Sequence, residues 1–167
     1  MAELQEKSYL AYLREWANGH EAVIPHGAQM NGLSFSAFCN ELRTMETDVA
    51  RSQGWVPAAL FALINQSHRV LAVSQLRYEL NDALLQHGGH IGYGVRPSER
   101  RKGYASLLLA LTLKEAKQIG LARVLLTCDK RNSGSARTII KNGGILENER
   151  DEGGRITQRY WIKLDES

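Results

Sequence analysis

With 167 residues, a net charge of +3, 43% hydrophobic residues and 23% charged residues, the chain has the balance of an ordinary folded protein. This composition excludes an intrinsically disordered chain, and the small net charge gives no support by itself to a nucleic-acid-binding protein. The length suits one compact domain, and the sequence holds no repeat, low-complexity tract or Pro/Ser-rich linker. We therefore expect a single domain over residues 1–167.

The signals that bear on compartment are few. The first residues lack the apolar core of a signal peptide, and no apolar run approaches the length of a membrane span. Two cysteines, Cys39 and Cys128, do not make a disulfide framework and are expected to be free thiols in a reducing environment. We therefore expect a cytoplasmic protein without a membrane partner.

The first half of the chain predicts two helices, a β-hairpin and a short strand. Apolar residues at helical spacing define the first helix, which ends at Asn18-Gly19. Strand-like runs joined by the polar turn "QSH" indicate the hairpin. The short strand that follows the hairpin ends at Pro97, which cannot donate a backbone hydrogen bond. Residues 81–89 fit no regular pattern. In chain order, the predicted elements are helices over residues 5–18 and from Ser34 or Ser36 to about Arg51, then strands over residues 58–65, 69–80 and 90–95.

The second half predicts a long helix, then a strand, a helix and a terminal hairpin. The long helix starts after Gly103, keeps apolar residues on the i, i+3, i+4 rhythm and ends at Gly120. The later elements are a buried strand over residues 122–128, a short helix over residues 133–144 and a hairpin of residues 145–149 and 155–164. This order predicts an α+β (α/β three-layer) fold in which helices flank one mixed central sheet.

Four cations gather where the short strand ends and the long helix begins: Arg96, Arg100, Arg101 and Lys102. A helix start exposes unpaired backbone N–H groups and the positive end of the helix dipole. Gly103 has no side chain, so the backbone there can approach a ligand closely. The site therefore suits a phosphate or a diphosphate. The alternative for such a charge run is a solvated surface turn.

The pattern around Gly103 is neither a Walker loop nor a dinucleotide-binding fingerprint. Residues 100–105 read R-x-x-G-x-A, which resembles the coenzyme A site of the GCN5-related N-acetyltransferases (GNAT). A strand and then Asn132, Ser135 and Gly143 follow in the order that this family uses, and the resemblance covers residues 57–164. It implies the GNAT fold, with a mixed, mostly antiparallel central sheet, although the usual first strand of the family is not found.

The resemblance implies a cofactor role for several residues. Backbone amides from Arg101 to Ser106 would hold the diphosphate of acetyl-CoA, and the basic side chains would add charge. Tyr93 and Val95 would pair with the pantetheine arm as an extra strand, and the Val95 amide would face the thioester oxygen. The implied cofactor-binding residues are Tyr93, Val95, Arg100, Arg101, Lys102, Gly103, Tyr104, Ala105, Ser106, Asn132 and Ser135. For Asn132, the role of a helix N-cap is an equal alternative.

Acid and base groups are harder to assign. Amine attack on a thioester needs a neutral amine, and His90, five residues before Val95, is the predicted general base. Strand alternation places these two residues on opposite faces unless a bulge intervenes, so a structural histidine is the alternative. In many relatives, a tyrosine seven positions after the residue that matches Asn132 acts as the general acid. This chain has Ile139 at that position.

The resemblance implies an N-acetyltransferase that transfers an acetyl group from acetyl-CoA to a primary amine in a ternary complex, without a metal. The acceptor would be a small-molecule or peptide amine, no nucleic acid is expected, and the terminal hairpin is a candidate homodimer contact. Two alternatives stay open. A non-catalytic CoA-binding module is favoured by Ile139 and by the uncertain base. A nucleic-acid-binding protein could use the same basic helix start, but no aromatic-basic interleaving supports it.

Overall fold

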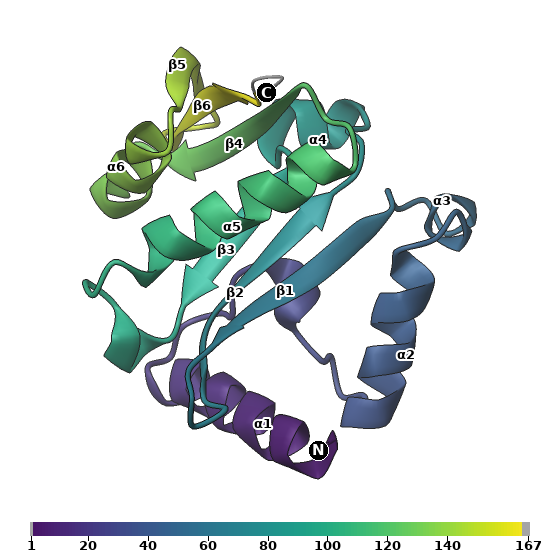
Figure 1. Cartoon of the computed structure of the whole chain (residues 1–167). Helices are drawn as coiled ribbons and strands as arrows, with labels where there is room; N and C mark the ends of the chain where they lie inside the picture. Colours follow the sequence, from purple (N-terminus) through teal and green to yellow (C-terminus); the bar gives the residue numbers. More distant parts are fainter. Residues whose placement is uncertain (1, 165–167) are drawn as a thin grey trace.

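Two three-stranded antiparallel sheets form the centre of the structure, a computed structural model that describes residues 2–164 (Figure 1). The first sheet has the strand order β1-β2-β3, and the second has the order β4-β6-β5. The strands are β1 (Ala58–Ile64), β2 (Val70–Arg77), β3 (Ile91–Val95), β4 (Arg123–Asp129), β5 (Ile145–Asp151) and β6 (Ile156–Lys163). All six were expected from the sequence, to within a few residues at their ends.

The division into two sheets differs from the single mixed sheet that the sequence predicts. The sheets meet at an isolated antiparallel bridge between Gly89 and Leu126, just before β3 begins. Beyond this bridge, β3 and β4 share no strand pairing in the described part of the chain, and each pairs only within its own sheet. Local patterns define where strands lie, but they do not say which strand edges separate.

Helices cover both faces of the first sheet. The helices of the described chain are α1 (Ala2–Asn18), α2 (Phe35–Met45), α3 (Val49–Ser52), α4 (Asp82–His87), α5 (Tyr104–Gln118) and α6 (Ser133–Lys141), with the single 3-10 turns η1 (His26–Ala28) and η2 (Pro97–Glu99). α5 crosses one face, where the hydroxyls of Ser74 on β2 and Thr112 lie 2.7 Å apart. Val73 points to the other face and packs against α1. Alternation along β2 thus places α5 and α1 on opposite sides (Figure 1).

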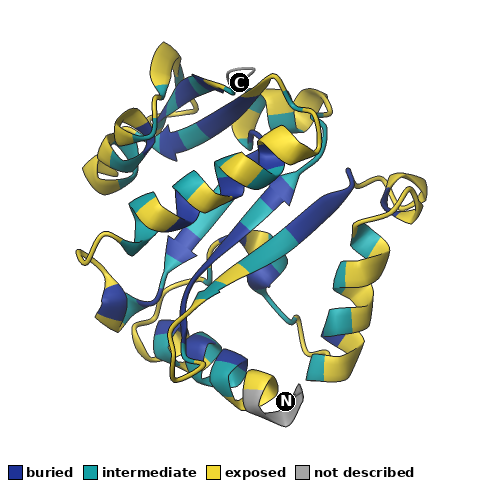
Figure 2. Cartoon of the chain, viewed as in Figure 1, coloured by how far each residue is buried: buried dark blue, intermediate teal, exposed yellow. Residues whose placement is uncertain are grey.

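The core consists of two buried clusters, one on each face of the first sheet. One lies between α5, α6 and both sheets and includes Leu109, Leu126 and Ile139. The other holds Tyr12 and Trp16 of α1 against β2, with Phe38 of α2 and others. Figure 2 shows the buried residues on the strands and on the sheet-facing sides of the helices. Burial of each large side chain contributes roughly 1.5–3 kcal/mol, so these clusters fix the helices on the sheets.

The second predicted helix is broken into two pieces. α2 begins after Ser34, whose hydroxyl accepts a hydrogen bond from the Ala37 amide, as the N-cap signal predicts. It ends at Met45 instead of continuing to Arg51, where α3 lies. The Thr47 hydroxyl donates to the Thr44 carbonyl and accepts from the Val49 amide. These local bonds compete with the helix ladder and separate the two pieces.

α4 is a helix that the sequence pattern does not predict. Its N-cap is Asn81, whose side chain accepts a hydrogen bond from the Leu84 amide at 2.9 Å. With none of its residues buried, it has no apolar stripe to reveal it. The cap residue was therefore the one available signal.

The C-terminal strands form the predicted hairpin, and its turn contains Gly153 and Gly154, both at positive φ. The role of this hairpin as a homodimer contact stays a prediction. Across residues 2–164, no helix combines the length and the apolar character needed to cross a bilayer.

Candidate active site

A cavity of about 630 Å³ opens where β3 ends, beside the first turns of α5 and α6. The free edge of β3 borders it, because β3 is the outer strand of its sheet and leaves β4 after the Gly89–Leu126 bridge. The predicted cofactor residues that line the cavity are Tyr93, Val95, Arg100, Arg101, Gly103, Tyr104, Ala105, Ser106, Asn132 and Ser135. Lys102 and His90 are the two predicted site residues that do not line it. The fold thus collects residues from three separate segments around one space.

The backbone at the start of α5 has the shape that the glycine motif requires. Gly103 adopts φ +86° at the N-cap of the helix, and Arg101 adopts φ +66°. A Cβ at Gly103 would meet nothing within 4 Å, so the space above this glycine is open. The first intrahelical bond runs from the Leu107 amide to the Gly103 carbonyl. The amides before Leu107 have no acceptor within the helix and face the cavity end.

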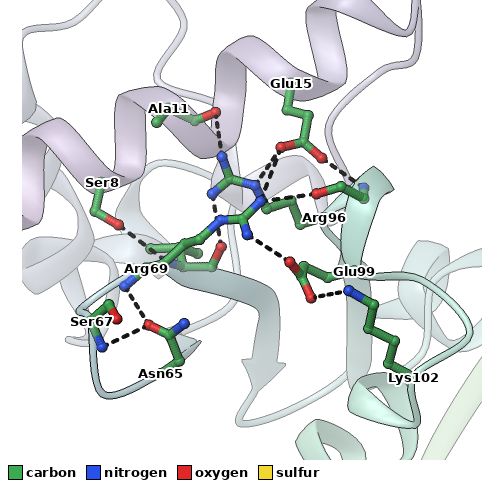
Figure 3. A network of polar contacts seen from close by, with 11 residues as sticks. Ser8, Ala11, Glu15, Asn65, Ser67, Arg69, Arg96, Glu99 and Lys102 are labelled. Atoms are coloured by element: carbon green, nitrogen blue, oxygen red, sulfur yellow. Dashed lines mark hydrogen bonds and ion pairs between the residues drawn. The ribbon is translucent and has the colours of Figure 1, made fainter.

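Of the four clustered cations, Arg96 is part of a buried ion-pair network and not of the cavity (Figure 3). Its Nε donates to Glu15 of α1 at 2.5 Å, and its terminal nitrogens donate to the carbonyls of Val70 and Ala11. Glu15 also accepts the Ser98 amide at 2.7 Å. Burial disfavours the charge of Glu15, but the hydrogen bonds from Ser98 and Arg96 outweigh it and lower its pKa to about 2. The network ties α1 to the turn before α5.

Lys102 belongs to the same network. Its Nζ lies 2.9 Å from the carboxylate of Glu99, which also accepts a hydrogen bond from Arg69 at 2.7 Å (Figure 3). The side chain of Glu99 is only 9% exposed, so it holds both cations against the turn. Lys102 does not line the cavity, contrary to the expectation from its position in the motif, although its partner Glu99 does.

Arg100 lines the cavity but is paired across it. Its two terminal nitrogens donate to both carboxylate oxygens of Glu21, at 2.9 and 2.8 Å, and its Nε donates to the Val95 carbonyl at 3.3 Å. The guanidinium lies over the ring of Trp16, 4.8 Å from the ring centroid. Trp16 and Glu21 therefore form the wall opposite α6. Nothing in their local sequence indicates this role.

α6 supplies the remaining wall. The Asn132 side chain accepts the Ser135 amide at 3.0 Å, so Asn132 is the N-cap of this helix and lines the cavity at the same time. Arg137 and Lys141, which the sequence reasoning missed, also line it. Where side chains are described, in residues 5–164, no carboxylate pairs with Arg137, Lys141 or Arg101. These three cations give the cavity the positive charge that the sequence ascribes to the whole cluster.

The Tyr93 side chain spans the gap between β3 and α6. Its hydroxyl oxygen lies 2.9 Å from the Ser135 hydroxyl oxygen, and both residues line the cavity. Burial raises the pKa of Tyr93 to about 12. Ile139, one turn further along α6, is fully buried in the core and offers no polar group. Tyr93 thus brings a protonated hydroxyl to the cavity beside Ser135.

His90 is placed differently from the predicted base. Its ring Nδ1 accepts a hydrogen bond from the Leu125 amide at 2.9 Å, and its own amide donates to the Leu125 carbonyl at 2.7 Å. Burial, together with the charges of Arg77 and Arg123, lowers its pKa to about 4. The structure does not bring His90 together with Val95 in the cavity. The two hydrogen bonds to Leu125 connect the start of β3 to β4. His90 therefore has the placement of a structural histidine, which is the alternative to a general base.

Within residues 5–164, no three His, Cys, Asp or Glu side chains gather where they could hold a metal ion. The cavity lining offers backbone amides, hydroxyl groups and three cations without carboxylate partners, beside the paired Arg100 and Glu21 and the carboxylate of Glu99. These groups suit a phosphate-bearing ligand with an extended arm.

A family comparison agrees with this geometry. The model of the acetyltransferase (GNAT) domain matches residues 11–145. The chain belongs to the GNAT family. Its α+β architecture and the placement of the glycine motif at the start of α5 are those expected for a GNAT acetyltransferase, which confirms the predicted family and fold class. No curated protein matches the chain.

Solved structures show the same fold at low sequence identity. The ribosomal-protein-S5-alanine acetyltransferase of Vibrio fischeri aligns with a TM-score of 0.70 and 14% identity, over 99% of this GNAT chain and 91% of its own. A spermidine N-acetyltransferase of Vibrio cholerae gives 0.64 and 14%, over 95% and 92%. The protein yncA of Salmonella typhimurium, solved with its cofactor acetyl-CoA, gives 0.63 and 16%, over 98% and 91%. At such identities the likeness concerns the fold alone.

Proposed function

We propose that this protein transfers an acetyl group from acetyl-CoA to a primary amine, by direct attack within a ternary complex. The observation that carries the proposal is the cavity itself. It joins the open edge of β3, the unpaired amides at the start of α5 and three cations without carboxylate partners. A thioester on an extended arm that ends in phosphate groups matches these three features in order.

The diphosphate would lie against the amides of residues 101–106, where the helix dipole adds positive potential. Arg101, Arg137 and Lys141 would meet its negative charges. Tyr93 and Val95 would pair their backbone with the amide groups of the pantetheine arm, as a neighbouring strand would. Lys102 has no direct contact in this proposal, because its ammonium group is paired with Glu99 and it does not line the cavity.

The amine must arrive neutral, because an ammonium has no lone pair with which to attack the thioester carbon. The carbonyl oxygen gains negative charge as the new C–N bond forms, and the Val95 amide is the donor that we assign to it. The C–S bond then breaks and releases a thiolate, while the attacking nitrogen loses a proton to solvent water. The Tyr93 hydroxyl would donate a hydrogen bond to that thiolate. With a pKa of about 12, Tyr93 keeps its proton and stabilises the sulfur as a donor.

One rival remains, a CoA-binding module without catalysis. It is favoured by the engagement of the His90 lone pair with the Leu125 amide and by the absence of a polar group at Ile139. Nucleic-acid binding is less well supported than the sequence suggested. Arg96, Arg100 and Lys102 are all held in ion pairs with carboxylates, which leaves a smaller free basic surface.

Release of free CoA thiol from acetyl-CoA tests the proposal, with a panel of primary amines that includes amino acids, polyamines and short peptides. Tertiary amines of matched shape serve as controls, because they cannot form a stable amide. We expect thiol release with at least one primary amine and an acetylated product by mass spectrometry. Binding of acetyl-CoA with no turnover across the panel would instead support the module.

A further inference from the structure

A second cavity, of about 570 Å³, lies on the other side of the first sheet from α5. It is bounded by α2, by the α1-facing side of β1 and β2, and by the start of α4. It shares no lining residue with the acetyl-CoA cavity. Its volume falls in the range of sites for small organic molecules.

One wall of this second cavity is apolar. Phe38, Leu42 and Met45 line it from α2, and Leu60 faces them from β1. Trp55 also lines it and is 59% exposed, which is unusual for so large a ring. Exposed aromatic surface beside an apolar wall indicates contact with the apolar body of a ligand.

The opposite wall contains a guanidinium without an anionic partner. Arg77, at the end of β2, donates to the Gly89 carbonyl at 3.0 Å and to the Gln75 side-chain oxygen at 3.3 Å, and both acceptors are neutral. No carboxylate pairs with Arg77 among residues 5–164, whose side chains the structure describes, and burial lowers its pKa. The two more deeply buried arginines differ, since Arg96 pairs with Glu15 and Arg159 with Glu147. A partly buried charge without a counterion is costly, and a ligand anion would relieve that cost.

Gln75 presents further polar atoms beside Arg77. The two residues are two positions apart on β2, so both side chains leave the same face of the sheet. The Gln75 side chain packs closely against Gly27 of the loop above it, because a Cβ on Gly27 would lie only 2.4 Å from the Gln75 side-chain nitrogen. A guanidinium fork and an amide, held side by side, match the two oxygens of one carboxylate.

The charges around this cavity limit the ligand to a single negative group. Glu41 lines it from the exposed side of α2, and its carboxylate disfavours a phosphate or a dicarboxylate. His26 is the other titratable residue that lines the cavity. We infer that the second cavity binds a monocarboxylate with an apolar body, its carboxylate on Arg77 and Gln75 and its body against Trp55 and the α2 wall. Such a ligand is either an amine acceptor that carries a carboxylate or an effector.

Binding of two matched probes tests this inference without acetyl-CoA, so the result does not depend on the proposed function. The probes are hydrocinnamate and its neutral amide, hydrocinnamide, titrated into the full chain and followed by NMR shifts of the backbone amides. We expect hydrocinnamate to bind about tenfold tighter than hydrocinnamide, since hydrogen bonds to a charged group are stronger than those to a neutral one. Equal affinities, or shifts outside the cavity lining, would overturn the inference.

Two variants locate the effect. Arg77→Gln should reduce hydrocinnamate binding about tenfold and leave hydrocinnamide binding unchanged. Trp55→Ala, at an exposed site where the fold is little affected, should weaken both probes to a similar degree. Arg123→Gln is the matched control, because Arg123 is an exposed arginine at the end of another strand and stacks on Trp161. Loss of hydrocinnamate binding in this control as well would contradict a role specific to Arg77.

A separate assay with acetyl-CoA decides whether the carboxylate ligand is an acceptor substrate or an effector. L-phenylalanine carries the same body and carboxylate together with an amine. Its acetylation, reduced by Arg77→Gln, would identify the cavity as part of the acceptor site. A change in turnover of other amines by hydrocinnamate, without acetylation of phenylalanine, would identify an effector site.

Discussion

The hydroxyl oxygens of Tyr93 and Ser135 lie 2.9 Å apart, and this contact joins β3 of the first sheet to α6 of the second half of the chain. It spans the gap in which the two sheets have separated, beside the cavity that we assign to acetyl-CoA. The pair therefore has two consequences. It closes the far side of the gap, and it leaves a proton donor next to the proposed position of the thiol.

Tyr93→Phe removes this donor and keeps the ring. Without the hydrogen bond to the leaving thiolate, we expect kcat to fall about tenfold, with the KM for acetyl-CoA changed by less than about twofold. Steady-state thiol release measures both constants. Tyr160→Phe is the matched control, because that hydroxyl bonds Gln158 on β6, away from the cavity. An unchanged kcat in Tyr93→Phe would remove the hydroxyl from the mechanism.

Gly103→Val tests the approach of the backbone to the diphosphate. Valine at φ +86° costs about 1–2 kcal/mol of backbone strain, and its side chain would fill the open space above the glycine. Gly120→Val is a close control, since Gly120 has φ +87°, equally open surroundings and a place at the far end of the same helix. Both variants should lose similar stability in urea unfolding. Only Gly103→Val should lose affinity for CoA, and equal affinities in the two would contradict the assigned site.

Glu15→Gln tests the network that holds the turn before α5. Removal of one partner from a buried ion pair costs roughly 3 kcal/mol, because Arg96 keeps its charge in a site where it is only 6% exposed. Glu21→Gln breaks the exposed pair with Arg100 and should cost about 0–1 kcal/mol. Urea unfolding of both variants gives the comparison. If both lost the same stability, the network would have no special part in fixing the turn.

His90 makes the stability of the protein depend on pH. Its pKa is about 4 in the folded state and near 6.5 when unfolded, so the unfolded chain binds the proton more readily between these values. The stability contributed by neutral His90 is complete above pH 6.5 and is lost as the pH falls toward 4. At pH 5 the expected loss relative to pH 8 is about 2 kcal/mol.

Urea unfolding at pH 8 and pH 5 measures this loss, and His90→Gln is the reference because it cannot titrate. The difference between the two pH values should be about 2 kcal/mol smaller in His90→Gln than in the parent chain. Identical pH dependence would show that the histidine titrates normally. The same variant should keep the shape of the pH–rate profile, since His90 does not line the cavity.

Much of the fold follows from local signals in the sequence. The β1–β2 hairpin and the bounds of α5 could be predicted because turn residues and glycines mark them directly; Gly120 adopts the left-handed backbone that ends α5. α4 escaped notice because its residues have no buried face, and the break between α2 and α3 depends on hydroxyl bonds of Thr47. The separation of β3 from β4 depends on strand pairing, which no local pattern specifies.

The lining of the first cavity was predicted more completely than its electrostatics. Backbone amides at Gly103 follow from the motif, but the fate of each cation depends on distant partners. Arg96 pairs with Glu15 across 81 positions, and Arg100 pairs with Glu21 across 79. Such partners cannot be read from a local charge run, and the same reason hid Arg137 and Lys141 of α6. The placement of His90 likewise depends on Leu125 of another strand.

Calorimetric titration of the purified chain with CoA and with acetyl-CoA tests the central claim most directly. We expect one binding site per chain for each ligand, with affinity that weakens as salt screens Arg101, Arg137 and Lys141. The absence of any heat with either ligand, from a chain that circular dichroism shows to be folded, would contradict the account.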